Sequence, residues 1–359
     1  MAHIQLKNIS KKFGSHTALK NLDVGIADGE FFVLLGETGA GKTTTLRVIA
    51  GLEAPTTGEV LIDGERVNDW GPAERDVALV LQQYSLYPRY TVRENLEFPL
   101  KSKIRATPRA EIDEKVARVA KVLRIEHLLE RKTDRLSGGE MQRVSIGRAI
   151  VREPRVFLMD EPLSALDAKL REALRTQLKN LQMNLGATFL FVTHDQVEAM
   201  SMGDKIGVLN EGRLVQIGTP QEIYSRPRNT FVARAVGSPP MNLLDGKVED
   251  GGAALSRAGQ TLPLAGTLNG SVAGRDLTFG IRPEDVRLDA GAPGQATIHD
   301  IEDHGVEKIL TLHAGASVLR ATVSAQTKVA YDEQVRFAWD PEKVHLFDRV
   351  SGLSLRHAS

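Results

Sequence analysis

Strand-length apolar runs alternate with segments of helical period up to about residue 235. Apolar residues recur at helical spacing between Arg109 and Ile125, and again from Leu174 to Leu185. This alternation predicts an α/β domain built on a mainly parallel sheet. The runs that predict buried strands are Phe31–Leu35, Val77–Leu81, Val156–Met159, Phe189–Val192 and Ile206–Leu209.

Two stretches depart from this alternation. No strand pattern occurs between residues 85 and 150, which predicts a helical subdomain over about residues 85–155. Thr219-Pro-Gln-Glu222 forms a capping-box pattern with proline at the first helical position, so a helix is expected to start there.

The pattern changes after Gly237-Ser-Pro-Pro-Met-Asn242, where glycines become frequent. Short alternating segments follow, Leu277–Ile281 and Val335–Trp339, which predict small antiparallel strands. We therefore expect a nucleotide-binding domain over residues 1–237 and an all-β, OB-like accessory domain over 238–359. The similar segments Val248–Gly251, of four residues, and Ile301–Gly305, of five, suggest a repeated half.

Composition narrows the functional class. The chain has 359 residues, 46 basic and 46 acidic side chains, and no cysteine. The charge balance gives no support for a nucleic-acid partner, and thiol chemistry is excluded. Apolar runs reach about five residues, against roughly 20 needed to cross a bilayer. We expect a soluble, cytoplasmic chain whose membrane role, if any, comes through a partner.

A glycine-rich loop, Gly36-Glu-Thr-Gly-Ala-Gly-Lys42-Thr43, lies between a predicted strand and a predicted helix. It matches the phosphate-binding pattern at every fixed position. The loop N–H groups suit phosphates, Lys42 suits the terminal phosphates, and the Thr43 hydroxyl suits Mg²⁺. The motif predicts an ATP site, with nucleotide contacts from Gly36, Gly39, Gly41, Lys42, Thr43 and Thr44.

A second phosphate motif is Leu136-Ser-Gly-Gly-Glu140, which precedes a run of helical period. It predicts an open helix N-terminus, whose free N–H groups and dipole favour an anion. Ser137 adds a hydroxyl, and Gly138 and Gly139 let a ligand approach the backbone. By itself the motif is also a common turn.

Two adjacent carboxylates, Asp160 and Glu161, follow the predicted strand Val156–Met159. Ligands bind at the carboxyl ends of strands in open α/β sheets. We expect Asp160 to serve Mg²⁺ with Thr43, and Glu161 to polarise the attacking water. The alternative is an acidic pair that merely begins a loop.

Three further residues are candidates. His194 ends the run Thr188–Thr193 and would bond the terminal phosphate. Gln82 follows another strand and would reach Mg²⁺ or water, although Gln83 beside it leaves the assignment open. Phe13 would stack on adenine, with core packing as the alternative.

The order of these motifs resembles the ATP-binding-cassette (ABC) ATPases over residues 1 to about 235. The resemblance implies a P-loop fold and a head-to-tail dimer. Each ATP would lie between Lys42 of one copy and Ser137 and Gly139 of the other. It also implies that Phe13 stacks on adenine and Glu161 is the catalytic base. The motifs are the phosphate loop, Gln82, Leu136–Glu140, Asp160-Glu161, Ser164-Ala-Leu-Asp167, which links the two sites, and His194.

Later segments resemble one subfamily. Residues 82–88 and 91–95 resemble the segment that receives a membrane subunit's coupling helix. Residues 237–242 and Gly280–Asp285 resemble the junction and β-domain of bacterial carbohydrate importers of the maltose type. This implies an ATPase at the cytoplasmic face of the inner membrane, working with two transmembrane permease subunits and, indirectly, an extracellular solute-binding protein.

Other functions stay open at this point. Polyamine, iron and oxyanion importers share the layout, and a soluble ABC ATPase acting on nucleic acid or ribosomes is a more distant alternative. The β-domain would also suit a regulatory role.

The chain departs from the usual pattern at three places. Glu37-Thr38 stands where Pro-Ser is usual and puts a carboxylate near the phosphates. Glu140 replaces a glutamine, so it can accept but not donate a bond to a ribose hydroxyl. Ala165 replaces a frequent asparagine and removes a polar contact across the dimer.

Overall fold

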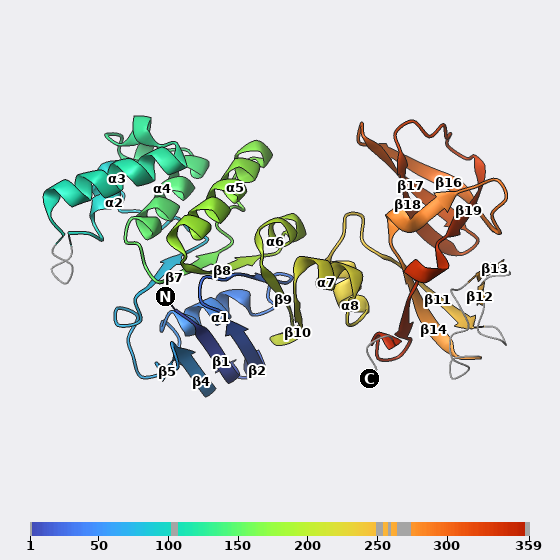
Figure 1. Ribbon diagram of the computed structural model, residues 1–359, viewed down its shortest axis with the longest axis horizontal. Coiled ribbons are helices and arrows are strands. Elements are labelled where there is room, and N and C mark those ends of the chain that lie inside the picture. Colours follow the sequence, from blue (N-terminus) through green and yellow to red (C-terminus); the bar gives the residue numbers. More distant parts are fainter. Residues whose placement is uncertain (1, 102–106, 249–253, 258–259, 264–273, 356–359) are drawn as a thin grey trace. The chain divides into compact units, whose positions relative to one another are not determined.

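The computed structural model describes residues 2–101, 107–248, 254–257, 260–263 and 274–355. The chain divides into two compact units, Met1–Pro220 and Gln221–Ser359 (Figure 1). The helices α7 (Pro220–Ser225) and α8 (Thr230–Ala235) thus fall almost wholly in the second unit. Our sequence-based boundary after residue 237 would assign them to the nucleotide-binding domain, and it stays a prediction.

A six-stranded sheet in the order β10-β9-β3-β8-β7-β6 forms the centre of the first unit. All five predicted strands are confirmed, and they run parallel, with β10 antiparallel at one edge. Every residue of β3, β7 and β8 is buried, as continuous apolar runs predict. The strands are β3 (Phe31–Leu35), β6 (Val77–Val80), β7 (Val156–Asp160), β8 (Thr188–Thr193), β9 (Lys205–Asn210) and β10 (Arg213–Gly218).

Outside the helical subdomain, the helices that follow strands of this sheet in the chain are α1 (Lys42–Ile49), α5 (Ala168–Leu185) and α6 (Gln196–Met202). The predicted apolar period in α5 is confirmed in part, because Leu174 and Leu178 are buried. In the sheet, the ring of Phe189 stacks on Phe157 at 4.5 Å and on Phe31 at 5.2 Å between centroids. This aromatic contact joins three neighbouring strands below the edge where the site lies.

An antiparallel sheet in the order β2-β1-β4-β5 was not predicted. Its strands are β1 (Ile4–Phe13), β2 (His16–Ile26), β4 (Thr57–Ile62) and β5 (Glu65–Arg66). Ile4, Ile9, Leu19 and Leu22 are fully buried and share one apolar core with the central sheet. The sheet places Phe13 at the end of β1, opposite His16.

The predicted helical subdomain is confirmed, and it contains α2 (Val92–Glu97), α3 (Arg109–Leu123) and α4 (Gly138–Ile150). The helices pack closely at Gly147 of α4. A Cβ atom there would lie 2.9 Å from Leu96 and 3.0 Å from Leu123, so any side chain would push the helices apart.

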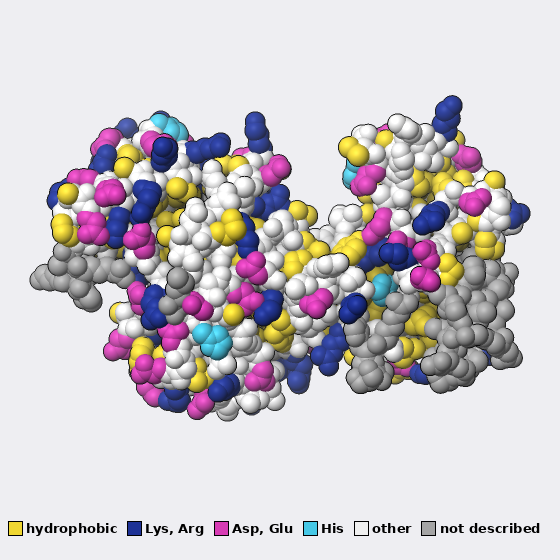
Figure 2. Space-filling model, viewed as in Figure 1, with side chains coloured by type: hydrophobic (Ala, Val, Ile, Leu, Met, Phe, Trp, Pro, Cys, Tyr) yellow, Lys and Arg dark blue, Asp and Glu magenta, His cyan; other side chains and the backbone are white. Residues whose placement is uncertain are grey.

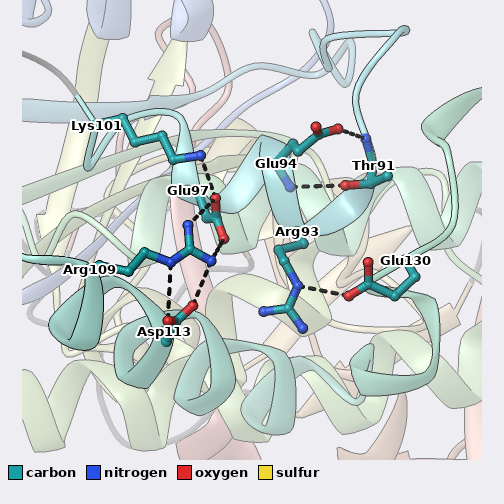
Figure 3. A network of polar contacts seen from close by, with 8 residues as sticks. All are labelled: Thr91, Arg93, Glu94, Glu97, Lys101, Arg109, Asp113 and Glu130. Carbon is teal, nitrogen blue, oxygen red and sulfur yellow. Dashed lines mark hydrogen bonds and ion pairs between the residues drawn. The ribbon is translucent and has the colours of Figure 1, made fainter.

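A network of ion pairs fastens α2 to α3 and to Glu130 (Figure 3). The Glu97 carboxylate is buried and lies between the Lys101 ammonium at 2.6 Å and the Arg109 guanidinium at 3.0 Å. Arg109 also binds Asp113 at 2.9 Å. Two cations thus compensate the buried charge, and the start of α3 is held to the end of α2. A Thr91–Glu94 capping box and an Arg93–Glu130 pair add to the network.

After α7 and α8, the rest of the second unit confirms the all-β prediction for the described residues from 238 on. Two five-stranded sheets, β13-β12-β11-β14-β20 and β15-β19-β16-β17-β18, enclose one apolar core. The predicted segments form β14 (Asp276–Ile281) and β19 (Gln334–Trp339). Of the suggested repeat, residues 249–251 lie outside the described residues. The other strands are β11 (Asn242–Val248), β12 (Ala254–Arg257), β13 (Gln260–Pro263), β15 (Val286–Leu288), β16 (Gly294–Asp303), β17 (Glu307–Ala314), β18 (Ser317–Ser324) and β20 (His345–Asp348).

A buried arginine joins α7 and α8 to this β-domain. Arg282 is 3% exposed and donates to the carbonyl oxygens of Val236 and, at 2.7 Å, Tyr224. Its guanidinium lies 3.9 Å from the centre of the Tyr224 ring. Gly237 has φ 109°, and a Cβ there would lie 2.6 Å from Arg282. The two sequence motifs that contain Gly237 and Arg282 therefore meet in space.

Acidic and basic side chains are interspersed over the face of the first unit drawn in Figure 2, in keeping with the even charge balance. Among the described residues, no helix has both the length and the apolar content needed to cross a bilayer.

Candidate nucleotide site

The predicted site residues follow adjacent strands at one edge of the central sheet. In the order of the strands, the glycine loop follows β3, His194 follows β8, Asp160 and Glu161 lie at the end of β7, and Gln82 follows β6. Leu35 pairs with Thr193, and Asp160 pairs with Val192, so the strand ends are level. The prediction that these segments meet at one edge is confirmed.

The glycine loop encloses a buried cation. Lys42, the first residue of α1, is 5% exposed, and its Nζ donates to the carbonyl oxygens of Gly36 at 2.9 Å and Glu37 at 3.0 Å. Gly39 and Gly41 have φ angles of 85° and 106°, which favour glycine. The loop thus holds an ammonium group at the start of a helix, the arrangement that binds phosphate.

Asp160 lies beside Thr43, the second residue of α1. The Thr43 hydroxyl donates to Asp160 Oδ1 at 3.0 Å. Asp160 is 4% exposed, and burial raises the pKa of its carboxyl group while the bond from Thr43 opposes that rise. A hydroxyl and a carboxylate side by side form an oxygen pair suited to a hard divalent cation.

Glu161 connects the loop to His194. One carboxylate oxygen lies 3.4 Å from Lys42 Nζ, and the other lies 2.9 Å from His194 Nδ1. The backbone of Glu161 is in the left-handed region at φ 45°, and its N–H donates to Val192 at 3.0 Å. Such a conformation is strained for a residue with a side chain and is commonest at functional sites. Together with the contacts to Lys42 and His194, this favours a functional role for Glu161 over an acidic pair that merely begins a loop, and the role stays a prediction.

Asp160→Asn should raise the thermal stability of the nucleotide-free protein while it removes ATP hydrolysis. The folded state holds the Asp160 proton more tightly than the unfolded chain, so ionisation at pH 7 lowers stability. Asparagine keeps an oxygen that can accept the Thr43 hydroxyl, and it has no charge to destabilise the folded state. The midpoint of thermal unfolding should therefore rise by roughly 2 °C.

Calorimetry at pH 7 and well below pH 3.8, the ordinary pKa of the carboxyl group, measures this effect, which should vanish in acid because both states are then protonated. Asp167→Asn is the matched control, because asparagine caps a helix as well as aspartate does. An unchanged or lower midpoint for Asp160→Asn at pH 7 would contradict the argument.

The predicted open end of α4 is wrong in one respect. Ser137 is its N-cap residue, and Glu140 folds back over it. Glu140 Oε2 accepts from the Ser137 N–H at 2.8 Å and from the Ser137 hydroxyl at 2.9 Å. These bonds hold the pKa of Glu140 below its usual value. The first N–H groups of the helix, including those of Gly138 and Gly139, still lack an intrahelical partner.

Other predicted residues lie apart from this cluster. Phe13 is 44% exposed with Lys11 Nζ at 4.8 Å from its ring centre, so the core-packing alternative is wrong. Gln82 and Gln83 are both exposed. Asp167 caps α5 by accepting from Leu170 N–H at 3.0 Å. Within the described part of the chain, no hydrogen bond or ion pair joins Gln82 or Ser137 to Lys42, so their roles stay predictions.

An aromatic surface in the helical subdomain was missed in part. Tyr87, Tyr90 and Phe98 are all exposed, and the ring of Tyr87 lies 4.3 Å from Phe98 and 5.5 Å from Tyr90 between centroids. Arg148 of α4 lies 5.2 Å from the Tyr87 ring and donates to Ser85 O at 2.7 Å. Resemblance indicated residues 82–95, whereas Phe98 and Arg148 carried no local signal.

This sheet, its loop around Lys42 and the acids at the next strand ends define a P-loop nucleotide hydrolase. Family models match three parts of the chain: ABC transporter at residues 19–164, MalK OB fold domain at 237–286 and TOBE domain at 279–347. The chain belongs to the ATP-binding subunits of ABC transporters, and it is an ATPase of that type.

Similar curated proteins extend over the full chain. The trehalose/maltose import ATP-binding protein MalK of Thermococcus litoralis is 45% identical over 99% of this chain and 100% of its own length. The sn-glycerol-3-phosphate import ATP-binding protein UgpC of Brucella abortus is 47% identical over 97% of each chain. The sulfoquinovosyl glycerol transport ATP-binding protein SmoE of Agrobacterium fabrum is 44% identical over 99% of this chain and 100% of its own.

Among solved structures, a dimeric ATP-binding cassette in a post-hydrolysis state with ADP and Pi is 35% identical. Its TM-score is 0.56, and the match covers 60% of this chain and 98% of that one.

Proposed function

We propose that this protein is the ATP-hydrolysing subunit of an importer for a carbohydrate or carbohydrate derivative, bound to the cytoplasmic face of the cell membrane. The observation that carries hydrolysis is the contact of Glu161 with both Lys42 and His194 at the carboxyl edge of the sheet. The solute class rests on relatives named for the import of trehalose, maltose and xylose or for the transport of sulfoquinovosyl glycerol.

In this proposal each site residue has a distinct task. Lys42 neutralises the terminal phosphates, Glu161 accepts a proton from the attacking water, and His194 orients Glu161 and bonds the γ-phosphate. Thr43 and Asp160 would hold Mg²⁺, which supplies charge neutralisation when bound. Phe13, exposed at the end of β1, is free to stack on adenine. Gln82 would contact the metal or the water.

The working unit is a head-to-tail pair of copies with two ATP molecules between them. Two observations support this arrangement: Ser137 has no described contact with Lys42 of its own chain, and the solved relative with ADP and Pi is a dimer. Ser137 and Gly139 of one copy would complete the site of the other, with Asp167 near the junction. Such sharing makes hydrolysis dependent on dimer closure.

The aromatic surface of Tyr87, Tyr90 and Phe98 is the proposed contact with the two permease subunits. Exposed aromatic clusters are typical of protein interfaces. The buried Asn95 amide holds this loop, because it accepts from Tyr87 N–H at 2.9 Å and donates to Tyr87 O at 3.2 Å. An extracellular binding protein would deliver solute to the permease.

Ser137→Arg should abolish hydrolysis and leave nucleotide binding to single copies intact, because Ser137 would serve the other copy's ATP. The arginine side chain would fill the space at the start of α4 and block only the site that this copy completes. ATP hydrolysis and the affinity for a fluorescent ATP analogue, measured on one preparation, test this. Mixing with an excess of Lys42→Ala chains should restore part of the activity, since each mixed dimer then holds one complete site. Full hydrolysis by single chains would contradict the shared site.

The solute is tested in the assembled transporter. Permease subunits that copurify with the chain are reconstituted, and hydrolysis is measured with candidate solutes and their binding protein. Stimulation by a sugar or sugar derivative supports the proposal, whereas stimulation by a polyamine, iron or an oxyanion alone assigns another importer. Failure of any permease to copurify favours a soluble ABC ATPase.

A further inference from the structure

The contact between Glu140 and Ser137 bears directly on the site that Ser137 would complete. An ionised carboxylate can only accept hydrogen bonds, so the Ser137 hydroxyl donates its single proton to Glu140. The Ser137 N–H donates to the same oxygen. Both donors at the entrance to α4 are thus engaged within the chain.

A phosphate at this helix end would compete with Glu140 for the same groups. The Ser137 hydroxyl must turn from Glu140 to reach a phosphate oxygen, and the carboxylate then lies beside another anion. The N–H groups of Gly138 and Gly139, at the positive end of the helix dipole, favour one anion at a time. Arg131 and Arg143 are the cations that act on Glu140 here.

We propose that Glu140 acts as an internal competitor for the partner's ATP, restraining closure of the dimer until the nucleotide concentration is high. The proposal rests on the function proposed above. Glu140 is a positioning residue: through Ser137 it sets the ATP concentration needed for closure, while the chemical step belongs to Lys42, Glu161 and His194.

The substitution Glu140→Gln removes the negative charge but keeps the size and shape of the side chain. Its amide oxygen can still accept the Ser137 N–H, so the helix keeps its cap, but the negative charge is gone. Glu140→Gln should lower the ATP concentration for half-maximal hydrolysis about fivefold and leave kcat within about twofold. The difference from the unsubstituted protein should shrink as salt rises from 50 to 500 mM, because salt screens the charge of the partly exposed Glu140 carboxylate.

The experiment uses the full chain and Mg-ATP. Hydrolysis is measured against ATP concentration, and dimer formation is followed by size-exclusion chromatography in a Glu161→Gln background that cannot turn over. Glu126→Gln is the matched control, because it removes one exposed acid from the same subdomain. Thermal midpoints of all variants check that the fold is preserved.

A fall in the required ATP concentration for Glu140→Gln alone supports the proposal. An unchanged or higher requirement overturns it, as does an equal fall for Glu126→Gln, which would reveal a general charge effect. Ser137→Arg keeps the two proposals apart. If that variant abolishes hydrolysis while Glu140→Gln changes nothing, the shared site stands and the competition does not. If Ser137→Arg is fully active, the shared site itself is wrong.

Discussion

Replacing Glu161 with glutamine should lower kcat for ATP hydrolysis by about 10²–10⁴-fold, the usual contribution of a general base. Glu161 is the only carboxylate described within 4 Å of Lys42 Nζ, which lies 3.4 Å from it. Glutamine keeps the size of the side chain but cannot take a proton from water. Loss of its negative charge beside Lys42 should also favour the phosphates, so ATP binding persists and closed dimers accumulate.

Steady-state hydrolysis and size-exclusion chromatography with Mg-ATP measure the two effects together. His194→Gln is the companion variant, because His194 Nδ1 lies 2.9 Å from the second oxygen of Glu161. It should reduce kcat less, since it leaves the base in place. Hydrolysis by Glu161→Gln within tenfold of the normal rate would remove Glu161 from this role.

Arg282→Met should destabilise the second unit by about 3 kcal/mol, because three backbone carbonyl groups lose a charged donor. Methionine keeps most of the apolar stem beside Tyr224 but leaves the oxygens of Val236 and Tyr224 unsatisfied in a buried place. The loss of stability comes more from buried carbonyl oxygens without a hydrogen-bond donor than from the lost side-chain volume.

The chain holds two tryptophans, Trp70 in the first unit and Trp339 in the core of the second. In a Trp70→Phe background, Trp339 fluorescence during urea unfolding therefore reports on the second unit alone. Arg282→Lys is the matched control: it keeps the charge but cannot reach several carbonyls with one ammonium, so an intermediate loss is expected. Equal unfolding midpoints for all three proteins would show that Arg282 does not hold these segments together.

The central sheet could be predicted because its strands are buried on both faces and read as unbroken apolar runs. The antiparallel sheet could not be read in the same way. Strand β1 changes register after Leu6, Ile9 and Lys11, and each irregularity interrupts the alternation of apolar and polar residues. Its pairing with β2 and β4 is visible only in the fold.

In the site, too, some features could be predicted from the local sequence and others could not. Gly36–Thr43 and the acids after β7 follow local rules, so their meeting at one edge was predictable. Ser137 and Glu140 match the capping-box spacing, yet the glycines between them favoured an anion-site interpretation. Arg282 shows what local patterns lack, because its carbonyl partners lie 46 to 58 residues away in the chain.

Helix α4 connects Ser137 to the aromatic surface. It has 13 residues and so extends about 20 Å, with Ser137 before its first turn and Arg148 in its last. Arg148 donates a hydrogen bond to Ser85 O and lies over the Tyr87 ring, while Gly147 allows the helix to pack closely against its neighbours. A hydrogen-bonded helix of this length is stiff, so its two ends are expected to move together. A displacement of the whole helix at Ser137 would therefore also move Arg148 and, through its contacts, the loop at Ser85 and Tyr87.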